Sequence, residues 1–340
     1  MKNFTWKTVM SYRNVAYGLA AIWIVLYHLE GYRHVEIPVI TKIFYMGNVP
    51  VDIFLFLSAI GLSYSIENNS LKQFYKNRFS KILVVYFLSI TPFMIWKYFV
   101  SMDIDALTIP KFLFELSTLS YFFTEEGLFP VWYIPCILLF YTCFPLLYKI
   151  YRKNKWYIIA LICLFVCSGI ILVKTDSIII CNIERTFSRI PIFLFGIFMS
   201  DCVKNNKRIN YIWIVGAFLV VIITMFIYPV TNHLGVYMHL MYIKYIYGVM
   251  GVSILVVGAF ILEKTKKYKI VGPFLKIFTF IGTLSLEVYL IHSALNRFLG
   301  YYNIFSYGHC LVHYIGVLGY SIFTGYFLSK IYRAILNRKV

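Results

Sequence analysis

The stretch RNVAYGLAAIWIVLYHLEG, residues 13–31, holds fourteen consecutive uncharged residues, almost all apolar, between Arg13 and His28. A helix rises about 1.5 Å per residue, so Arg13 and His28 stand about 22 Å apart along its axis. That distance covers most of the roughly 30 Å hydrocarbon core of a bilayer. The stretch therefore predicts a membrane helix with a cation at one end and an imidazole near the other.

The rest of the chain has the same character. Of its 340 residues, 61% are hydrophobic and 14% are charged, and the mean hydropathy is +0.76. Soluble domains carry roughly 25% charged residues. The apolar runs are continuous rather than alternating, which excludes a β-barrel. The sequence predicts an all-α, polytopic integral membrane protein that forms one domain over residues 1–340, with about ten spans: 12–30, 48–66, 82–100, 131–149, 156–173, 189–203, 210–228, 238–262, 274–294 and 310–331.

The net charge of +18 follows from membrane topology. Cytoplasmic loops of membrane proteins are rich in Lys and Arg. With a cytoplasmic N-terminus, 23 of the 32 basic residues fall on the cytoplasmic side, mostly within 72–81, 149–155, 204–208, 264–269 and 330–339. We therefore expect both termini in the cytoplasm, and we expect no nucleic-acid partner. An anionic ligand at the cytoplasmic face stays possible.

Three further features bear on organisation. The N-terminal residues 1–11 are polar and lack a cleavage site, so we expect no cleaved signal peptide. The segment 101–130 contains an apolar run too short to span and several acidic residues, and we predict an extracytoplasmic excursion with a short interfacial or re-entrant helix.

The seven cysteines form no C-x-x-C pair, and His309 with His313 lacks the glutamate of H-E-x-x-H. We expect no metal site.

Ionisable residues at membrane depth are costly and usually mark function. His28, Asp52, Glu287 and His292 all fall in the outer half of the predicted membrane, on three spans. The simpler interpretation is that each lies at the wet interface. The chemical interpretation is general base catalysis or transient acylation by a neutral imidazole, oriented by a carboxylate such as Asp52 or Glu287.

Five segments in series resemble one family. GNVPVDIFLFLSAIGLSYS (47–65) resembles the G-x-x-G-V-D…S-G signature of membrane acyltransferase family 3, the bacterial O-acyltransferases of surface polysaccharides. The remaining matches are FYKNRFSKIL (74–83), VWYIPCILLFYTCFPLLY (131–148), RIPIFLFGIF (189–198) and GTLSLEVYLIH (282–292). With the first span, the resemblance covers residues 12–330 in the expected order.

The resemblance implies that His28 is the catalytic histidine. The family places an Arg eleven residues before it, where this chain has Tyr17, while Arg13 lies one turn earlier. Arg13 either replaces the family residue or anchors the helix end. The family's second pair of arginines falls on Arg78 and Lys81, which the resemblance implies as ligands of the donor's phosphates.

Other positions depart from the family pattern. A common pair of glutamates falls on Ile137 and Leu138, so no role carries over to them, and Ala59 replaces a glycine. The resemblance implies transfer of an acyl group, most simply acetyl, from cytoplasmic acyl-CoA (acetyl-CoA) to a hydroxyl of a surface polysaccharide or lipid-linked glycan. It implies a multi-pass protein of the bacterial plasma membrane, with no resident cofactor.

Two other function classes fit a polytopic bundle. A transporter or flippase for a polysaccharide precursor would show related halves with broken helices in matching positions, which the sequence lacks. A glycan polymerase or glycosyltransferase would favour paired carboxylates in a large external loop, and Glu125-Glu126 is the only adjacent acidic pair.

Aromatic residues near the outer face either form an interfacial belt or stack on sugars: Tyr121, Phe122, Phe123, Trp132 and Tyr133.

Overall fold

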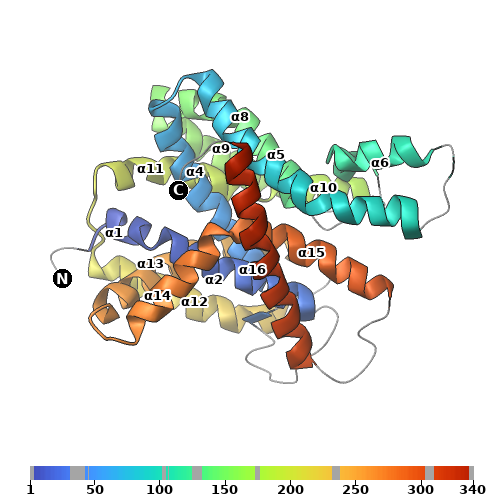
Figure 1. Ribbon diagram of the computed structural model, residues 1–340. Helices are drawn as coiled ribbons and strands as arrows, with labels where there is room; N and C mark the ends of the chain where they lie inside the picture. Colours follow the sequence, from blue (N-terminus) through green and yellow to red (C-terminus); the bar gives the residue numbers. More distant parts are fainter. Residues whose placement is uncertain are drawn as a thin grey trace.

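The computed structural model is a bundle of helices (Figure 1). It describes residues 4–30, 43–44, 46–101, 105, 107–124, 132–172, 177–231, 238–302 and 310–336. No strand occurs among these residues, and one isolated antiparallel bridge joins Thr5 to Arg208. The prediction of an all-α fold is confirmed.

The described helices are numbered in chain order. Their bounds are α1 Trp6–Ser11, α2 Arg13–Glu30, α4 Asn48–Glu67, α5 Leu71–Trp96, η1 Lys97–Ser101, α6 Thr108–Leu116, α7 Ser120–Phe123, α8 Tyr133–Lys153, α9 Lys155–Leu172, α10 Ile178–Phe187, α11 Ile190–Lys204, α12 Tyr211–Thr231, α13 Met238–Thr265, α14 Val271–Thr283, α15 Ser285–Tyr301 and α16 Cys310–Ile335. Each predicted span falls on one of these helices or, for 82–100 and 274–294, on two.

Five helical stretches within the described residues are long and apolar enough to cross a membrane: Asn48–Glu67, Leu71–Ser101, Tyr133–Lys153, Ile179–Lys204 and Lys244–Thr265. A sixth appears if the bent pair α14 and α15 counts as one span. The chain is thus a multi-pass helical protein by length and composition, and the number of spans supported in this way is five or six rather than the predicted ten.

The predicted span 274–294 falls on two helices, α14 and α15. The chain turns by 69° between α14 and α15, and Leu284 closes the end of α14 with a hydrogen bond from its N–H to the carbonyl of Ile281 at 3.0 Å. Just before the turn, the backbone of Gly282 lies against α2. The bend is therefore fixed by a tertiary contact, which hydropathy does not report.

The contact between α2 and α14 is a close approach of two backbones. A Cβ added to Gly18 would lie 2.1 Å from the carbonyl oxygen of Phe278, and one added to Gly282 would lie 1.8 Å from the carbonyl oxygen of Asn14. Small residues permit such packing between membrane helices. Because α2 also packs on α4 and α15, the helix that carries His28 is held from several sides.

The segment 101–130 contains two short helices, α6 and α7, at the end of the bundle far from α1 (Figure 1). Lys97 of η1 lies 3.5 Å from Glu115 of α6. Tyr121 of α7 and Asn182 of α10 exchange two hydrogen bonds of 3.0 Å. The excursion is therefore attached to α5 and α10, and its extracytoplasmic position stays a prediction.

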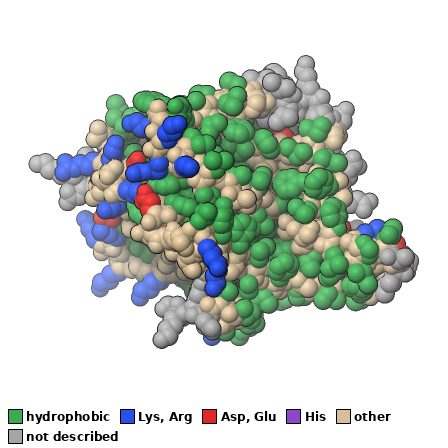
Figure 2. Space-filling model, turned by 90° about the horizontal axis from the view of Figure 1, so that it is seen from above, with side chains coloured by type: hydrophobic (Ala, Val, Ile, Leu, Met, Phe, Trp, Pro, Cys, Tyr) green, Lys and Arg blue, Asp and Glu red, His purple; other side chains and the backbone are tan. Residues whose placement is uncertain are grey.

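Basic side chains gather at one end of the molecule, the side on which α1 lies in Figure 1, whereas hydrophobic side chains cover most of the remaining face (Figure 2). The loop between α13 and α14 contributes exposed lysines at positions 264, 266, 267 and 269. This separation of charge from apolar surface is what a membrane protein with one basic face requires.

Candidate active site

Two imidazoles, that of His28 on α2 and that of His292 on α15, meet inside the bundle. Nδ1 of His28 lies 2.7 Å from Nε2 of His292, and the two rings are nearly parallel, with centroids 5.1 Å apart. His292 is completely buried. The structure thus brings together two of the predicted site residues that lie 264 positions apart in the sequence.

The hydrogen bonds assign the protons of this pair. Nδ1 of His292 lies 2.9 Å from the carbonyl oxygen of Val288, which only accepts, so Nδ1 carries a proton. A buried imidazolium without a carboxylate partner is costly, so the ring is neutral and its Nε2 accepts. Nδ1 of His28 therefore donates to it. The remaining nitrogen of His28, Nε2, keeps its lone pair and has the form of a general base.

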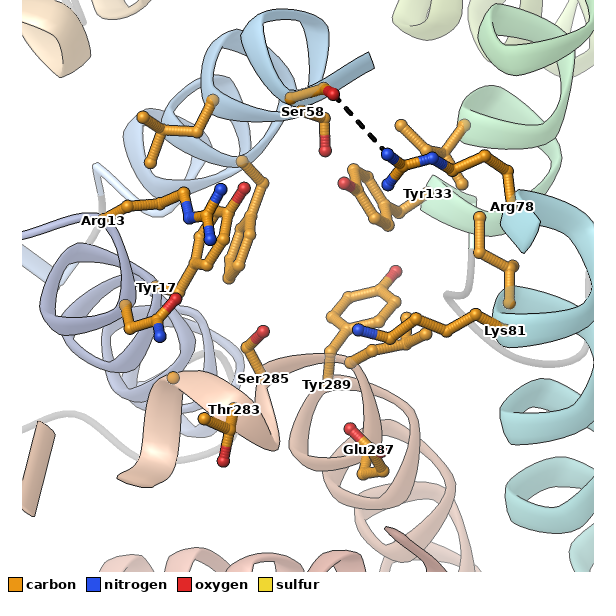
Figure 3. Close-up of a pocket in the computed structure, with 18 of the residues that line it drawn as sticks. Arg13, Tyr17, Ser58, Arg78, Lys81, Tyr133, Thr283, Ser285, Glu287 and Tyr289 are labelled. Atoms are coloured by element: carbon orange, nitrogen blue, oxygen red, sulfur yellow. Dashed lines mark hydrogen bonds between the residues drawn. The ribbon is translucent and has the colours of Figure 1, made fainter. Parts of the chain in front are cut away.

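A cavity of about 470 Å³ lies between α2, α4, α5, α8, α15 and α16, and neither His28 nor His292 lines it. Four cations line it, Arg13 from α2, Arg78 and Lys81 from α5 and Arg333 from α16. Figure 3 shows Arg13 beside Tyr17 and Lys81 pointing into the space between the helices. Within the described residues, none of the four forms an ion pair.

Helical periodicity relates the residues that line the cavity to the two histidines. Arg13, Tyr17 and Ile24 line it, and they share one face of α2 with His28 because they are offset by four, seven and four residues. On α15, Ser285 and Tyr289 line it in the same way and precede His292. Ile24 lies one turn, about 6 Å, before His28. The lining residues Ile24 and Tyr289 thus precede His28 and His292 by about one helical turn.

The other polar lining of the cavity is mixed. Arg78 donates to the carbonyl of Gly61 at 3.5 Å, and its Nε is buried without a partner. Glu287 lines the cavity and is only 2% exposed. The aromatic rings that line it include Tyr17, Tyr133, Tyr141 and Tyr289. The site therefore combines an excess of positive charge with several tyrosine rings, of which Tyr17, Tyr133 and Tyr289 are labelled in Figure 3.

The predicted carboxylate partners of His28 lie elsewhere. Neither Asp52 nor Glu287 is hydrogen-bonded to His28 or His292; besides the contacts given above, Ser293 Oγ lies 3.4 Å from Nε2 of His292. Asp52 accepts two hydrogen bonds of 2.8 and 2.9 Å from Arg189, which also donates to Asn48 at 2.7 Å. The carboxylate of Asp52 thus ties α4 to α11. Its part in catalysis stays a prediction, and the partner of His28 is an imidazole.

Several charged residues of the interior were missed at the level of the sequence. Arg189 is fully buried. Glu184 of α10 and Lys244 of α13 form a second buried ion pair, with Nζ 2.7 Å from Oε1. Arg333 belongs to the basic segment 330–339, which predicts only a cytoplasmic position for it, yet it lines the cavity. The sequence signal for such buried charges is a charged residue at the start of an apolar segment, as at Arg189, or inside one, as at Lys244.

The remaining sequence predictions concern metals and cysteines. No group of three or more His, Cys, Asp or Glu with metal-binding geometry occurs among the described residues. His309 lies outside them, so the pair it forms with His313 is not described. Six cysteines are described, all with free thiols.

Comparison with known proteins gives one match. A family model described as "Acyltransferase domain" matches residues 14–333. No curated protein and no solved structure matches the chain. The matched range includes both imidazoles and all but one of the cations that line the cavity, since Arg13 lies directly before it.

Proposed function

The chain belongs to the acyltransferase 3 family, and from this premise we propose that it is a membrane O-acyltransferase that transfers acetyl from cytoplasmic acetyl-CoA to a hydroxyl of a surface or lipid-linked glycan. The observation that carries the proposal is a cavity lined by four cations, none in an ion pair within the described residues, whose lining residues on α2 and α15 lie one turn from a neutral imidazole pair. A phosphate-bearing thioester fits both ends of such a cavity.

The cationic end suits the phosphates of CoA. Arginine binds phosphate oxygens in a bidentate manner and lysine acts as a point charge. Arg78, Lys81 and Arg333 reach the cavity from α5 and α16, and Arg13 reaches it from α2. Arg13 lies in the same cavity as Tyr17, which occupies the position of the family arginine. We therefore propose that Arg13 supplies the missing charge from one turn lower on α2.

The imidazole end suits the thioester. His28 Nε2 takes the proton of the acceptor hydroxyl while the hydroxyl oxygen attacks the thioester carbonyl carbon. The carbon–sulfur bond then breaks, and the CoA thiolate leaves and takes the proton from His28. The products are the O-acyl ester and the CoA thiol. His292 holds the Nδ1–H of His28 throughout, so the lone pair of Nε2 stays directed at the substrate.

The proposed topology places donor and acceptor on opposite sides of this imidazole pair. We propose ten spans with both termini in the cytoplasm of a bacterium and the chain in its plasma membrane. The basic end of the molecule in Figure 2 then faces the cytoplasm, where acetyl-CoA is present. The glycan approaches from the other side, past the ends of α2 and α15.

A transport function is the alternative to be tested. The bent pair α14 and α15 is the kind of broken helix that transporters place at substrate sites. Within the described residues it is the only pair bent in this way, so no second broken helix marks a related half. This single break is better explained by the contact of Gly282 with α2.

The test uses acetyl-CoA labelled in the acetyl group and membranes that contain wild type, His28→Ala or His313→Ala. His313 is a buried histidine that does not line the cavity, so its variant controls for the loss of any buried imidazole. We expect His28→Ala to lower label transfer into glycan by about 10²- to 10⁴-fold and His313→Ala to retain it. Label retained on purified protein identifies an acyl-His28 route. Equal transfer by wild type and His28→Ala overturns the proposal and favours transport.

A further inference from the structure

Asn296 is the most unusual buried polar residue of the described chain. It is 5% exposed, and neither its Nδ2 nor its Oδ1 has a hydrogen-bond partner. Among the described residues, it is the only one with two such atoms. Asn182 is a useful contrast, because its buried amide donates to the carbonyl of Tyr121 at 3.0 Å.

Leaving a buried amide unpaired costs stability. Such an amide can make up to four hydrogen bonds, two as donor and two as acceptor. An apolar side chain of similar size would avoid the penalty. A residue that carries this cost without a partner in the fold is best explained by a partner outside it.

The position of Asn296 indicates where that partner binds. Asn296 follows His292 by four residues and Tyr289 by seven, so the three share one face of α15. Helical side chains lean toward the N-terminus of their helix, which directs the amide of Asn296 toward the turn of His292. The cavity that we propose to bind the acyl donor is lined on this face by Ser285 and Tyr289. Asn296 therefore lies one turn beyond His292 along α15, whereas the α15 residues that line the cavity lie before His292.

We propose that Asn296 binds the acceptor in the transfer reaction, with Oδ1 accepting from a hydroxyl and Nδ2 donating to a neighbouring hydroxyl or ring oxygen. This inference rests on the proposed function and adds an acceptor subsite to it. The ligand class is a polyhydroxylated molecule such as a sugar, because both the donor and the acceptor atoms of the amide are unsatisfied. An oxyanion alone would use only Nδ2 and leave Oδ1 unpaired.

The amide is covered in this structure, so an acceptor reaches it only when neighbouring side chains move aside. That requirement is consistent with a site that excludes water. Water entering at His28 would compete with the acceptor hydroxyl for the thioester. Covering the acceptor subsite until a sugar displaces the cover protects the donor from hydrolysis.

The test compares wild type with Asn296→Leu, Asn296→Ala and the control Ser321→Ala. Ser321 also carries a buried oxygen without a partner, but on α16. Three quantities are measured: the melting temperature of the purified protein, binding of labelled acetyl-CoA, and label transfer into glycan at limiting amounts of acceptor membranes. We expect both Asn296 variants to keep the wild-type melting temperature or exceed it, because the substitution removes an unpaired polar group.

We also expect both variants to bind acetyl-CoA normally and to lose about 10- to 100-fold in transfer at limiting acceptor, the loss of one or two hydrogen bonds to substrate. Ser321→Ala should match wild type in all three measurements. Wild-type transfer by the Asn296 variants overturns the acceptor subsite while the proposed function stands. A lower melting temperature or weaker acetyl-CoA binding in both variants overturns it in favour of a structural role. Absence of transfer by the wild type overturns the proposed function itself.

Discussion

Gly282→Ala tests the contact on which the geometry of the site depends. The added Cβ would lie 1.8 Å from the carbonyl oxygen of Asn14, whereas ordinary contact begins at 3.4 Å. The helices α2 and α14 would have to separate by about 1.6 Å, the difference between these distances. The obstacle is backbone on a helix, so no side chain can rotate away. Overpacking of this kind costs about 1–3 kcal/mol or more.

The same separation should impair transfer as well as stability. Arg13, Tyr17 and His28 all belong to α2, and a misplacement of about 1 Å in a catalytic site can lower the rate about 10²-fold. We expect the melting temperature of the detergent-solubilised variant to fall and acetyl transfer to drop by about that factor.

Gly272→Ala provides a matched control in the same helix. A Cβ at Gly272 meets nothing within 4 Å, and replacing a helical glycine by alanine stabilises by about 0.5–1 kcal/mol. The two variants should therefore move the melting temperature in opposite directions. If Gly282→Ala had the same melting temperature as Gly272→Ala and transferred acetyl at the wild-type rate, α2 and α14 would not be in the contact described.

Three other predictions address the site and its support. His292→Leu should lower the transfer rate about 10- to 100-fold at unchanged KM for acetyl-CoA, with partial recovery in His292→Gln, whose oxygen can accept from His28; equal losses in both would exclude a positioning role. Asp52→Asn should destabilise by about 3–5 kcal/mol, because it leaves the charge of Arg189 buried without its partner; a wild-type melting temperature would contradict this. Arg13→Gln should raise the KM for acetyl-CoA about 10-fold or more and leave the protein's melting temperature unchanged; an unchanged KM would make Arg13 a helix anchor only.

Much of the helical organisation could be predicted because apolar runs and helix boundaries are local properties. The first predicted span, 12–30, corresponds to α2 at Arg13–Glu30, and 238–262 corresponds to α13 at Met238–Thr265. Hydropathy alone placed the third span at 82–100, whereas α5 begins at Leu71. The additional turns carry Lys72, Lys76 and Arg78, which lower the hydropathy without ending the helix.

The pairing of residues across the bundle could not be predicted in the same way. Asp52 and His28 have similar predicted depths, but depth does not fix the direction in which a side chain points. The nearest cation to Asp52 is Arg189, 137 positions away. The sequence did bring His28 and His292 into one set of candidates by depth. Their direct hydrogen bond depends on the approach of α15 to α2, which the bend after α14 makes possible.

The contacts of α2 also have a consequence for synthesis of the protein. This helix leaves the ribosome before α14 and α15, which complete its surroundings and begin only at Val271 and Ser285. Until they are inserted, His28 has no partner imidazole, and the cavity lacks the lining residues that α14 and α15 contribute. A chain that stops before α15 therefore lacks the paired imidazoles, however well its first helices insert into the membrane.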